Sequence, residues 1–303
     1  MRQICTYLVA GHLFGIEAES TSFLWSMMKE CYGPFAVDSD QIRRFTLSVS
    51  EMVEMPSDAV HAYSNREDVE DGFIILDVFR SAEGHHFIMS QPRSVEPNGR
   101  LFVSADYSGA EVSLHGTRIE QWLTFTAAVD FCYLLSTACH DTVLTHSSAV
   151  MYKGRAYIFL GKSGTGKSTH SRMWLKALED VELMNDDHPV IRLDRDGNPV
   201  VYGTPWSGKT HCYKNVQAPL GGIIRISRAP YNKPNRLSPI HGYASLMTSC
   251  SGMTWEKDLA DGKDRALQGI VSRTPCWVME CLPDEDAARI CSQAVTAVWE
   301  ERE

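Results

Sequence analysis

The sequence lacks any run of apolar residues long enough to cross a membrane. Its richest apolar stretch, Val129–Leu135, contains Asp130 and ends before Ser136, well short of the ~18 consecutive apolar residues that a spanning helix needs. The apolar run near the N-terminus is interrupted by His12 and closed by Glu17, and it has no small-residue cleavage pattern. We therefore expect neither a membrane partner nor a secretory signal.

The sequence also lacks an excess of positive charge. Its 303 residues include 29 Lys and Arg against 38 Asp and Glu, which gives a net charge of −9 at pH 7. A protein that binds duplex nucleic acid normally presents a basic surface, so we expect no nucleic-acid partner. Apolar residues make up 44% and charged residues 22%, a mixture typical of folded globular proteins.

Paired cysteines are missing as well. The nine cysteines are an odd number, and none of them forms a C-x-x-C pair, which argues against a zinc site or a disulfide framework. Most of them stand beside apolar residues, where a reduced thiol packs as a small hydrophobic group. This usage is typical of a reducing compartment, and we predict a cytoplasmic protein.

No linker, repeat or low-complexity tract divides the chain, but its first half reads as β-rich. Short β-branched and aromatic runs alternate with turn formers, which predicts a meander sheet. The predicted strands cover residues 4–9, 45–49, 73–79, 101–104 and 111–114, with a helix over 21–31. A second helix over residues 119–138 is apolar nearly all round, and we expect it to join the two halves.

The second half alternates strand-like and helix-like segments, which predicts an α/β domain. The predicted strands cover residues 148–152, 155–160, 181–184, 190–193, 222–226 and 276–281, with helices over 168–178 and 284–300. The sequence thus predicts an α/β protein with two domains, a β-rich domain over residues 1–140 and a nucleotide-binding domain over residues 141–303.

The strongest motif is G-K-S-G-T-G-K-S at residues 161–168, which matches the pattern G-x-x-x-x-G-K-[ST] in full. An apolar strand leads into it and a helix follows, which is the context that a phosphate-binding loop requires. Glycines let the backbone N–H groups surround phosphates at a helix N-terminus. We expect Lys167 to reach the β- and γ-phosphates, Ser168 to bind Mg²⁺, and the Lys167 side chain to face solvent without a ligand. The predicted nucleotide-binding residues are Gly161, Lys162, Ser163, Gly164, Thr165, Gly166, Lys167, Ser168 and Thr169.

An acidic pair, Asp186 and Asp187, follows the next predicted strand. Adjacent carboxylates at a strand end can bind Mg²⁺ and accept a proton; an acidic turn before Pro189 is the alternative. His146, on the strand that enters the second domain, is a third candidate, with a core histidine as its alternative.

Other polar residues give weaker signals. Lys209 could contact a phosphate or an acceptor, or it is a solvated loop residue. A charge-neutralising arginine could be any of Arg225, Arg228 and Arg236. The remaining histidines of interest have no further ligand at metal spacing, and we interpret them as surface or edge-strand residues: His12, His85 and His86.

The stretch from His146 to Asp187 resembles the catalytic core of HPr kinase/phosphorylase, a bacterial serine kinase related to phosphoenolpyruvate carboxykinases. A histidine one hairpin before the loop and an Asp pair closing the next strand are shared. The resemblance implies that His146 is an active-site histidine and Lys167 the catalytic lysine. It also implies that Ser168 is a metal ligand and that one aspartate of the pair takes the proton of the acceptor hydroxyl.

The layout is also similar to the HPr-kinase-like proteins of peptide-modification clusters, such as the kinases of lasso-peptide precursors. Residues 203–209, 218–222 and 237–239 support this similarity. The chain has no match to the HPr kinase segment that supplies a further metal-binding glutamate and a later arginine. The resemblance therefore does not extend to HPr as acceptor or to phosphorolysis.

We therefore predict a P-loop kinase that uses ATP and Mg²⁺ to phosphorylate a hydroxyl, with a serine of a peptide or small protein as the favoured acceptor. Asp187 is the favoured metal ligand and Asp186 the favoured base. Two alternatives stay open, a nucleotide-sensing regulatory ATP-binding protein and a small-metabolite kinase. We expect the β-rich half, which has no catalytic cluster, to shape acceptor binding. The acceptor, the nucleotide preference and the oligomeric state are not determined by the sequence.

Overall fold

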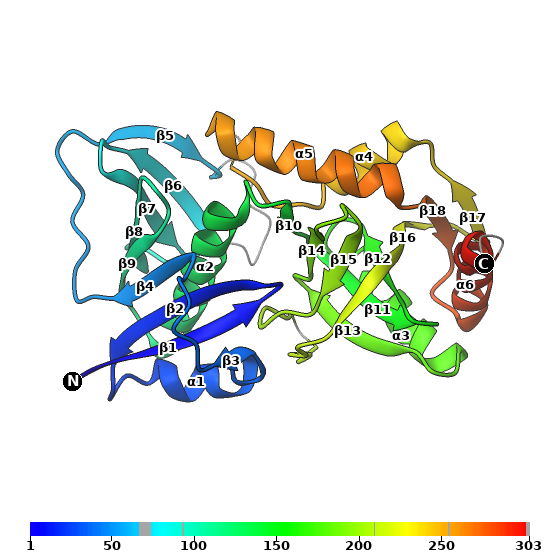
Figure 1. Cartoon of the computed structure of the whole chain (residues 1–303), viewed down its shortest axis with the longest axis horizontal. Coiled ribbons are helices and arrows are strands. Elements are labelled where there is room, and N and C mark those ends of the chain that lie inside the picture. The colour runs from blue at the N-terminus through cyan, green and yellow to red at the C-terminus, as the bar shows by residue number, and fades with distance from the viewer. Residues whose placement is uncertain (67–73, 93, 209, 254, 301–303) are drawn as a thin grey trace. The chain divides into compact units, whose positions relative to one another are not determined.

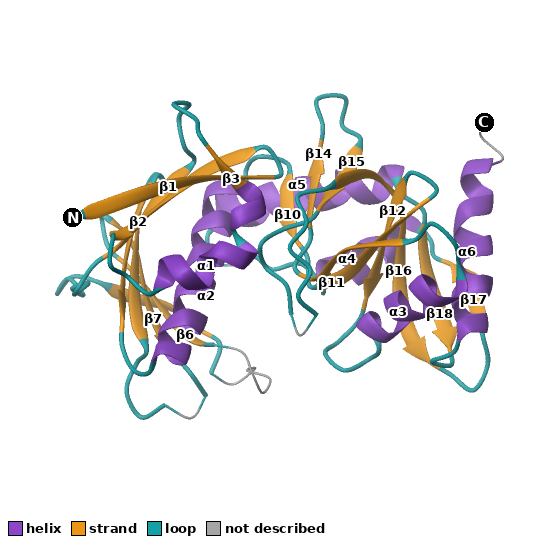
Figure 2. Cartoon of the chain, turned by 90° about the horizontal axis from the view of Figure 1, so that it is seen from below, coloured by secondary structure: helices purple, strands orange, loops and turns teal. Residues whose placement is uncertain are grey.

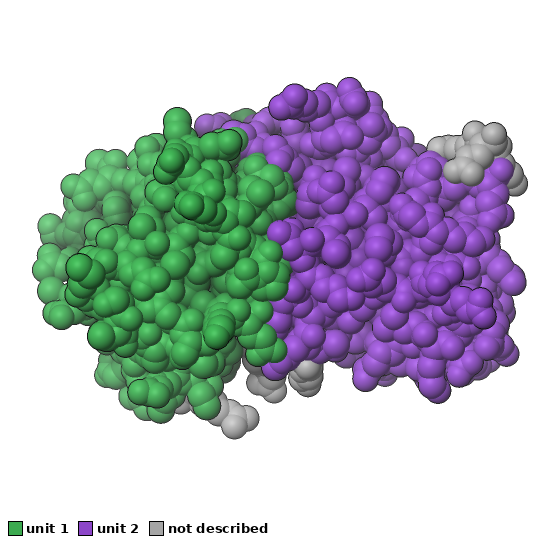
Figure 3. Space-filling view, turned by 60° about the horizontal axis from the view of Figure 1, so that its bottom comes forward, with its two compact units in different colours: residues 1–137, 253–257 green, residues 138–252, 258–303 purple. Residues whose placement is uncertain are grey.

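The computed structural model describes residues 1–66, 74–92, 94–208, 210–253 and 255–300. Within these ranges the chain contains six α-helices and two nine-stranded sheets, so the mixed α/β class predicted from the sequence is confirmed (Figure 1). The chain divides into two compact units (Figure 3). The first unit comprises residues 1–137 and 253–257, and the second comprises residues 138–252 and 258–303.

The first unit is built on one sheet with the strand order β3-β1-β2-β4-β9-β8-β7-β6-β5. Strands β5 to β9 form an antiparallel meander, as the turn signals predict. Strand β4 instead pairs in parallel with both β2 and β9, so the prediction of a simple meander is wrong for the sheet as a whole. Of the predicted strand over residues 73–79, Phe73 lies outside the described residues. The strands are β1 (Arg2–Val9), β2 (His12–Glu19), β3 (Ala36–Val37), β4 (Phe45–Val49), β5 (Val60–Ser64), β6 (Ile75–Arg80), β7 (Gly84–Ser90), β8 (Gly99–Ser104) and β9 (Gly109–Leu114).

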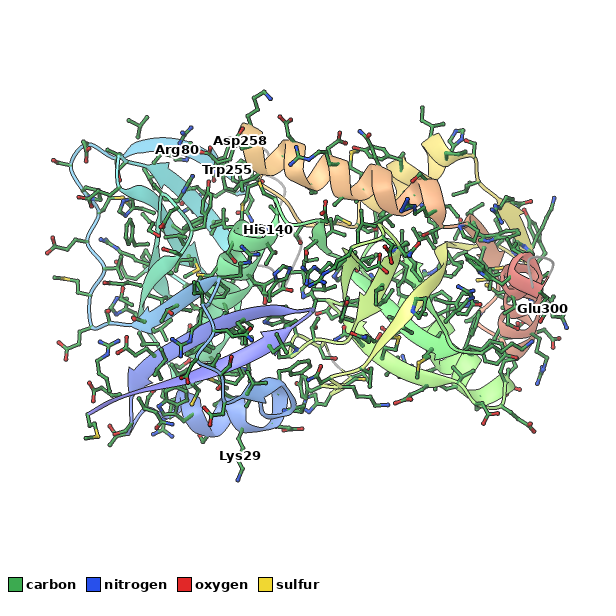
Figure 4. All side chains as sticks on the ribbon, in the orientation of Figure 1. Lys29, Arg80, His140, Trp255, Asp258 and Glu300 are labelled. Carbon is green, nitrogen blue, oxygen red and sulfur yellow. The ribbon has the colours of Figure 1, made fainter. Side chains whose placement is uncertain are left out.

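Helix α2 (Arg118–Thr137) packs on strands β4, β8 and β9 of this sheet. Its apolar pattern runs nearly all round, but the first two turns leave Ile119 71% and Leu123 45% exposed. Further along, Phe125 is fully buried, and the Tyr133 hydroxyl donates to the Val9 carbonyl oxygen at 3.2 Å. A shorter helix, α1 (Leu24–Cys31), presents Lys29 on its exposed side (Figure 4).

Three histidines of the first unit are buried, which corrects their interpretation as surface or edge-strand residues. His12, His85 and His86 are 2%, 6% and 4% exposed. Strands β2 and β7, which carry them, each have a neighbour on both sides. Buried imidazoles need polar partners, and His86 Nε2 lies 3.0 Å from Ser81 Oγ. These histidines are core residues, a possibility that their isolation in the sequence does not reveal.

Residues 253–257 belong to the first unit, although they connect two helices of the second. The Trp255 ring stacks on Tyr63 with centroids 4.5 Å apart. The Glu256 carboxylate lies 2.9 Å from Arg80 Nε and 3.0 Å from His85 Nε2. Figure 4 labels Arg80 and Trp255, which anchor this segment. Nothing in the sequence pattern indicates this packing, because it depends on side chains far apart in the chain.

The second unit has a sheet with the strand order β10-β14-β15-β16-β12-β11-β13, extended by β18 beside β16 and β17 beside β18. The strands are β10 (Thr142–Leu144), β11 (Ser147–Tyr152), β12 (Arg155–Leu160), β13 (Glu182–Asp187), β14 (Val190–Leu193), β15 (Pro199–Tyr202), β16 (Gln217–Arg228), β17 (Lys233–Arg236) and β18 (Cys276–Cys281). The helices are α3 (Lys167–Ala177), α4 (Pro239–Met247), α5 (Lys257–Arg273) and α6 (Glu285–Glu300).

Helices cover both faces of this second sheet. On one face, Leu246 of α4 and Ile270 of α5 share a buried cluster with Ile158 of β12. On the other face, Trp174 of α3 and Cys291 of α6 belong to a second cluster, and these two helices lie side by side (Figure 2). Apolar side chains therefore hold the central strands rigidly from both sides, so the strand ends are fixed in position.

The described part of the chain has no helix that is long and apolar enough to cross a membrane. All nine cysteines are free thiols, and all except Cys5 and Cys139 are buried. Burial raises the pKa of several of these thiols, for example that of Cys276 to about 11. They act as small apolar core groups, as the sequence predicts.

Candidate active site

The topology of the second sheet brings several polar segments to one edge. Strand β11 runs antiparallel to both β12 and β13, and β16 runs parallel to β12. The carboxyl ends of β12, β13 and β16 and the amino end of β11 therefore meet at the same edge. This edge carries the 161–166 loop after β12, Asp187 at the end of β13, His146 just before β11 and Arg228 at the end of β16.

The 161–166 loop joins β12 directly to α3, so a strand, a loop and a helix lie where the sequence predicts them. Gly164 and Gly166 have φ values of 75° and 113°, in the region that favours glycine. A Cβ atom at either position would meet nothing within 4 Å. The backbone thus faces open space, where phosphate oxygens could approach its N–H groups. The predicted nucleotide-binding residues occupy this loop and the first turn of α3: Gly161, Lys162, Ser163, Gly164, Thr165, Gly166, Lys167, Ser168 and Thr169.

The Lys167 side chain is buried, at 9% exposure, which corrects the expectation that it faces solvent. Its Nζ donates to the Gly161 carbonyl oxygen at 2.9 Å, and the Lys162 carbonyl oxygen lies at 3.5 Å. Because a buried ammonium needs acceptors, the side chain folds back onto the carbonyl groups of its own loop. Phosphate oxygens could replace these carbonyl groups as its partners.

Arg228 also contacts the loop. Its guanidinium donates to the carbonyl oxygens of Gly164 and Thr165. Arg236 lies instead over the Trp277 ring, 4.9 Å from the centroid. Arg228, one of the three arginines suggested by the sequence, therefore touches the loop.

A buried histidine stabilises the start of α3. His170 is 4% exposed, and its backbone N–H donates to the Gly166 carbonyl oxygen at 2.8 Å. Trp174 Nε1 donates to His170 Nε2 at 3.1 Å, so this nitrogen carries a lone pair and no proton. Burial lowers the pKa of His170 from its ordinary 6.5 to about 4. Protonation of His170 Nε2 would place its N–H against the Trp174 Nε1–H in the core, two donors with no acceptor between them.

We expect His170→Gln to weaken the pH dependence of stability between pH 6.5 and pH 4. In this window the unfolded chain binds a proton at His170 that the folded chain does not, so the free energy of unfolding falls as the pH falls, by up to about 3 kcal/mol. Glutamine keeps an acceptor for Trp174 but does not titrate. Urea unfolding of both proteins at pH 7 and pH 4.5 measures the difference; equal losses would show that His170 does not carry the effect.

Asp187 is the centre of a polar cluster. Its Oδ1 lies 3.2 Å from His146 Nδ1, and its Oδ2 lies 3.8 Å from His188 Nδ1. The two imidazole rings are 5.6 Å apart. Burial tends to raise the pKa of Asp187, but the hydrogen bond from His146 and the charges of His188, His146 and Lys167 outweigh it, so this pKa lies below its ordinary value. Asp187 is therefore an anion at neutral pH, within the field of the Lys167 ammonium.

His146 lies on a bend between β10 and β11, not on a strand as predicted. Its backbone N–H donates to the Ser249 carbonyl oxygen at 2.6 Å, which fixes the bend. His188 was not singled out in the sequence, although it directly follows the Asp pair. Burial is the main cause that lowers the pKa of His188, with His146 and Lys167 adding to it against the opposing effect of Asp187. A neutral imidazole keeps a lone pair for a metal ion.

Asp186 faces the opposite side of the sheet from Asp187. It pairs with Ser148, whose hydroxyl lies 2.6 Å from Ser171 Oγ of α3, whereas Asp187 pairs with Ser147. Because side chains alternate along a strand, Asp186 lies on the α3 face. It is buried, and its Oδ1 has no hydrogen-bond partner among the described residues. A buried carboxylate oxygen of this kind can accept a proton.

The cluster fits a divalent metal ion. His146, Asp187 and His188 each offer one ligand atom, and these atoms all lie within 4.8 Å of one another. Two nitrogens and one oxygen suit Mn²⁺, Co²⁺ or Zn²⁺. Mg²⁺ prefers oxygen ligands, which here would come from Asp187 and from Ser168 as the sequence predicts. The donor set therefore fits Mn²⁺ better than Mg²⁺. Lys209, another candidate from the sequence, lies outside the described residues.

A search of solved structures finds the HPr(Ser) kinase/phosphatase from Coxiella burnetii. The sequence identity is 9% and the TM-score 0.30, and the match covers 52% of this chain and 90% of that chain. No family model and no curated protein matches the sequence. The similarity to this structure is distant.

Proposed function

We propose that this protein transfers the γ-phosphoryl group of ATP to a hydroxyl, with a serine of a peptide or small protein as the favoured acceptor. One observation carries the proposal: a glycine-rich loop with a buried lysine and a carboxylate that contacts two imidazoles lie at the same edge of one sheet. The Lys167 charge is among the causes that lower the pKa of Asp187. A phosphate-binding loop and a metal-binding carboxylate at one sheet edge are the parts that phosphoryl transfer requires.

In the proposed reaction the loop binds the ATP phosphates and Lys167 exchanges its carbonyl partners for phosphate oxygens. Asp187, with Ser168 and the two imidazoles, would hold the divalent ion, which neutralises charge on the phosphates when bound. Asp186, whose Oδ1 has no hydrogen-bond partner among the described residues, would take the proton of the acceptor hydroxyl while the acceptor oxygen bonds to the γ-phosphorus, the bond from that phosphorus to the β-phosphate oxygen breaks and ADP leaves. Such a transfer leaves little covalent work to the protein, so positioning and electrostatics set the rate.

In the proposed function, the first unit binds the acceptor. The described His, Cys, Asp and Glu side chains that could together hold a metal lie in the second unit. The first unit instead offers a broad sheet and a partly exposed apolar helix, α2, which suit a peptide or protein surface. A cytoplasmic location agrees with nine free thiols and forms part of the proposal.

A transfer assay with the full chain tests the proposal. The chain is incubated with radiolabelled ATP, Mg²⁺ or Mn²⁺, and a library of serine-containing peptides, with Ser→Ala versions of each as controls. We expect labelled peptide that depends on the serine and more label per unit time with Mn²⁺. ATP hydrolysis without transfer would favour a regulatory nucleotide sensor, and label on a small hydroxyl compound would favour a metabolite kinase. Absence of ATP binding would overturn the proposal.

A further inference from the structure

A buried polar cluster connects the end of β13 to the loop that follows β15. Asn185 is fully buried, and its side-chain amide uses both of its ends. Its Nδ2 donates to Thr204 Oγ1 at 3.1 Å and to the Trp206 carbonyl oxygen at 3.0 Å. Its Oδ1 accepts from the backbone N–H groups of Asp187 at 3.0 Å and His188 at 2.9 Å. The Asn185 side chain therefore joins the backbone at Asp187 and His188 to the loop that contains Thr204 and Trp206.

Thr204 completes the cluster from the other side. It is also fully buried, and its hydroxyl donates to the His188 carbonyl oxygen at 2.7 Å. Thr204 Oγ1 also accepts from Asn185 Nδ2 and, at 3.3 Å, from the Trp206 backbone N–H. The peptide groups on both sides of His188 are thus held, its N–H by Asn185 and its carbonyl by Thr204. A buried network whose members are satisfied is rigid and specifies one geometry.

The loop held by this cluster also borders the Asp pair. The Gly208 backbone N–H donates to the Asp186 carbonyl oxygen at 3.3 Å, and Ser207 pairs with Asp187. A Cβ atom at Gly208 would lie 3.2 Å from the Asp187 carboxylate, closer than most such contacts. The loop therefore packs against the Asp187 carboxylate, and hydrogen bonds through Thr204 and Trp206 fix the position of the loop.

We infer that Asn185 and Thr204 are positioning residues for Asp187 and His188. They fix the backbone turn from which both side chains project. They also fix the loop around Gly208, which limits where the Asp187 carboxylate can lie. The inference rests on the proposed function only in taking Asp187 and His188 as metal ligands. Groups that orient ligands from behind commonly change metal affinity by about 10- to 100-fold when they are lost.

Two substitutions of Thr204 test this inference. Thr204→Val keeps the shape but removes the hydroxyl, which leaves the His188 carbonyl without that donor, whereas Thr204→Ser keeps the hydroxyl. We expect Thr204→Val to weaken Mn²⁺ binding by about tenfold or more, and Thr204→Ser to bind within about twofold of the original chain. Binding of Mn²⁺ to the full chain is measured by electron paramagnetic resonance. Affinity for metal-free ATP should stay unchanged in both variants, because the 161–168 segment is not touched.

Unchanged Mn²⁺ affinity in a folded Thr204→Val variant would overturn the inference. If that variant does not fold, Gly208→Ala decides, because it places a methyl group against Asp187 from a half-buried position of the loop. We expect weaker Mn²⁺ binding with unchanged metal-free ATP binding, and original Mn²⁺ affinity in Gly208→Ala would overturn the inference. Loss of Mn²⁺ affinity in a chain that transfers no phosphoryl group would support positioning and refute the proposed kinase. Phosphoryl transfer by the original chain, together with unaffected Mn²⁺ binding in the variants, would support the proposed kinase and overturn the positioning role of Asn185 and Thr204.

Discussion

Replacement of Lys167 by methionine is expected to lower phosphoryl transfer by at least about 10²–10³-fold. Methionine keeps most of the apolar stem, but it cannot donate to the Gly161 carbonyl oxygen that Lys167 Nζ contacts at 2.9 Å. It also removes one of the charges that act on Asp187. Turnover should therefore fall more than nucleotide affinity, because the ammonium acts on charge that develops during transfer. Single-turnover transfer and calorimetric titration with a non-hydrolysable ATP analogue measure the two effects.

Lys176→Met is the matched control for this change. Lys176 lies on the same helix, its side chain is 69% exposed and it lies 3.5 Å from the Glu285 carboxylate, so its loss should leave transfer and binding unaltered. Thermal unfolding of both variants checks that the fold is kept. Equal transfer by Lys167→Met and the original chain would show that the 161–168 segment does not bind the reacting phosphates.

The loop and its flanks could be predicted because their signal is local. An apolar run with a turn on each side specifies β12, whose observed bounds, Arg155–Leu160, are those predicted. Gly164 and Gly166 need positive φ values, and only glycine adopts these without strain. Short-range sequence is therefore sufficient for a strand, a loop and a helix in succession.

Helix α5 was missed because long-range packing overrides its local signal. It contains two glycines, which disfavour a helix. A Cβ atom at Gly262 would lie 2.6 Å from the Ala138 carbonyl oxygen, and one at Gly269 would lie 2.5 Å from the Leu193 side chain. Both glycines are there because neighbouring segments approach closely. The reason for them is invisible until the fold is known.

The cluster around Asp187 was predicted in part. Asp187 and His146 stand out by their order relative to the loop, but His188 and Asn185 look like parts of an acidic turn. Their roles depend on the bend that places His146 opposite β13 and on the loop after β15 that reaches back to Asn185. Contacts between segments about 20 to 40 residues apart cannot be derived from spacing alone.

Substitution of Asp187 and Asp186 by asparagine is expected to impair transfer in two different ways. Asparagine keeps the shape of aspartate but loses the negative charge. At Asp187, which lies among the ligand atoms of the proposed metal site, weaker coordination should be partly reversed by more Mn²⁺ or Mg²⁺, because lost affinity is overcome by concentration. At Asp186, more metal should not help, and transfer should fall by on the order of 10²–10⁴, the usual contribution of a positioned base.

The measurement is phosphoryl transfer to an accepted peptide over a series of metal concentrations, with ATP binding followed in parallel. Asp196→Asn serves as the control, because Asp196 is an exposed residue of the turn between β14 and β15. It removes one negative charge from the same unit without touching the site. Its transfer rate and metal dependence should match those of the original chain.

The opposite orientation of the two carboxylates makes this comparison decisive. Asp186 lies on the α3 face with Ser148, and Asp187 lies on the other face with Ser147, so neither side chain can replace the other without a break in the strand. If added metal restores transfer in Asp187→Asn but not in Asp186→Asn, Asp187 binds the metal ion and Asp186 accepts the proton. The reverse pattern would exchange the two roles and keep the kinase. Near-original transfer by both variants at ordinary metal concentration would mean that the pair is an ordinary strand end and that the proposed mechanism is wrong.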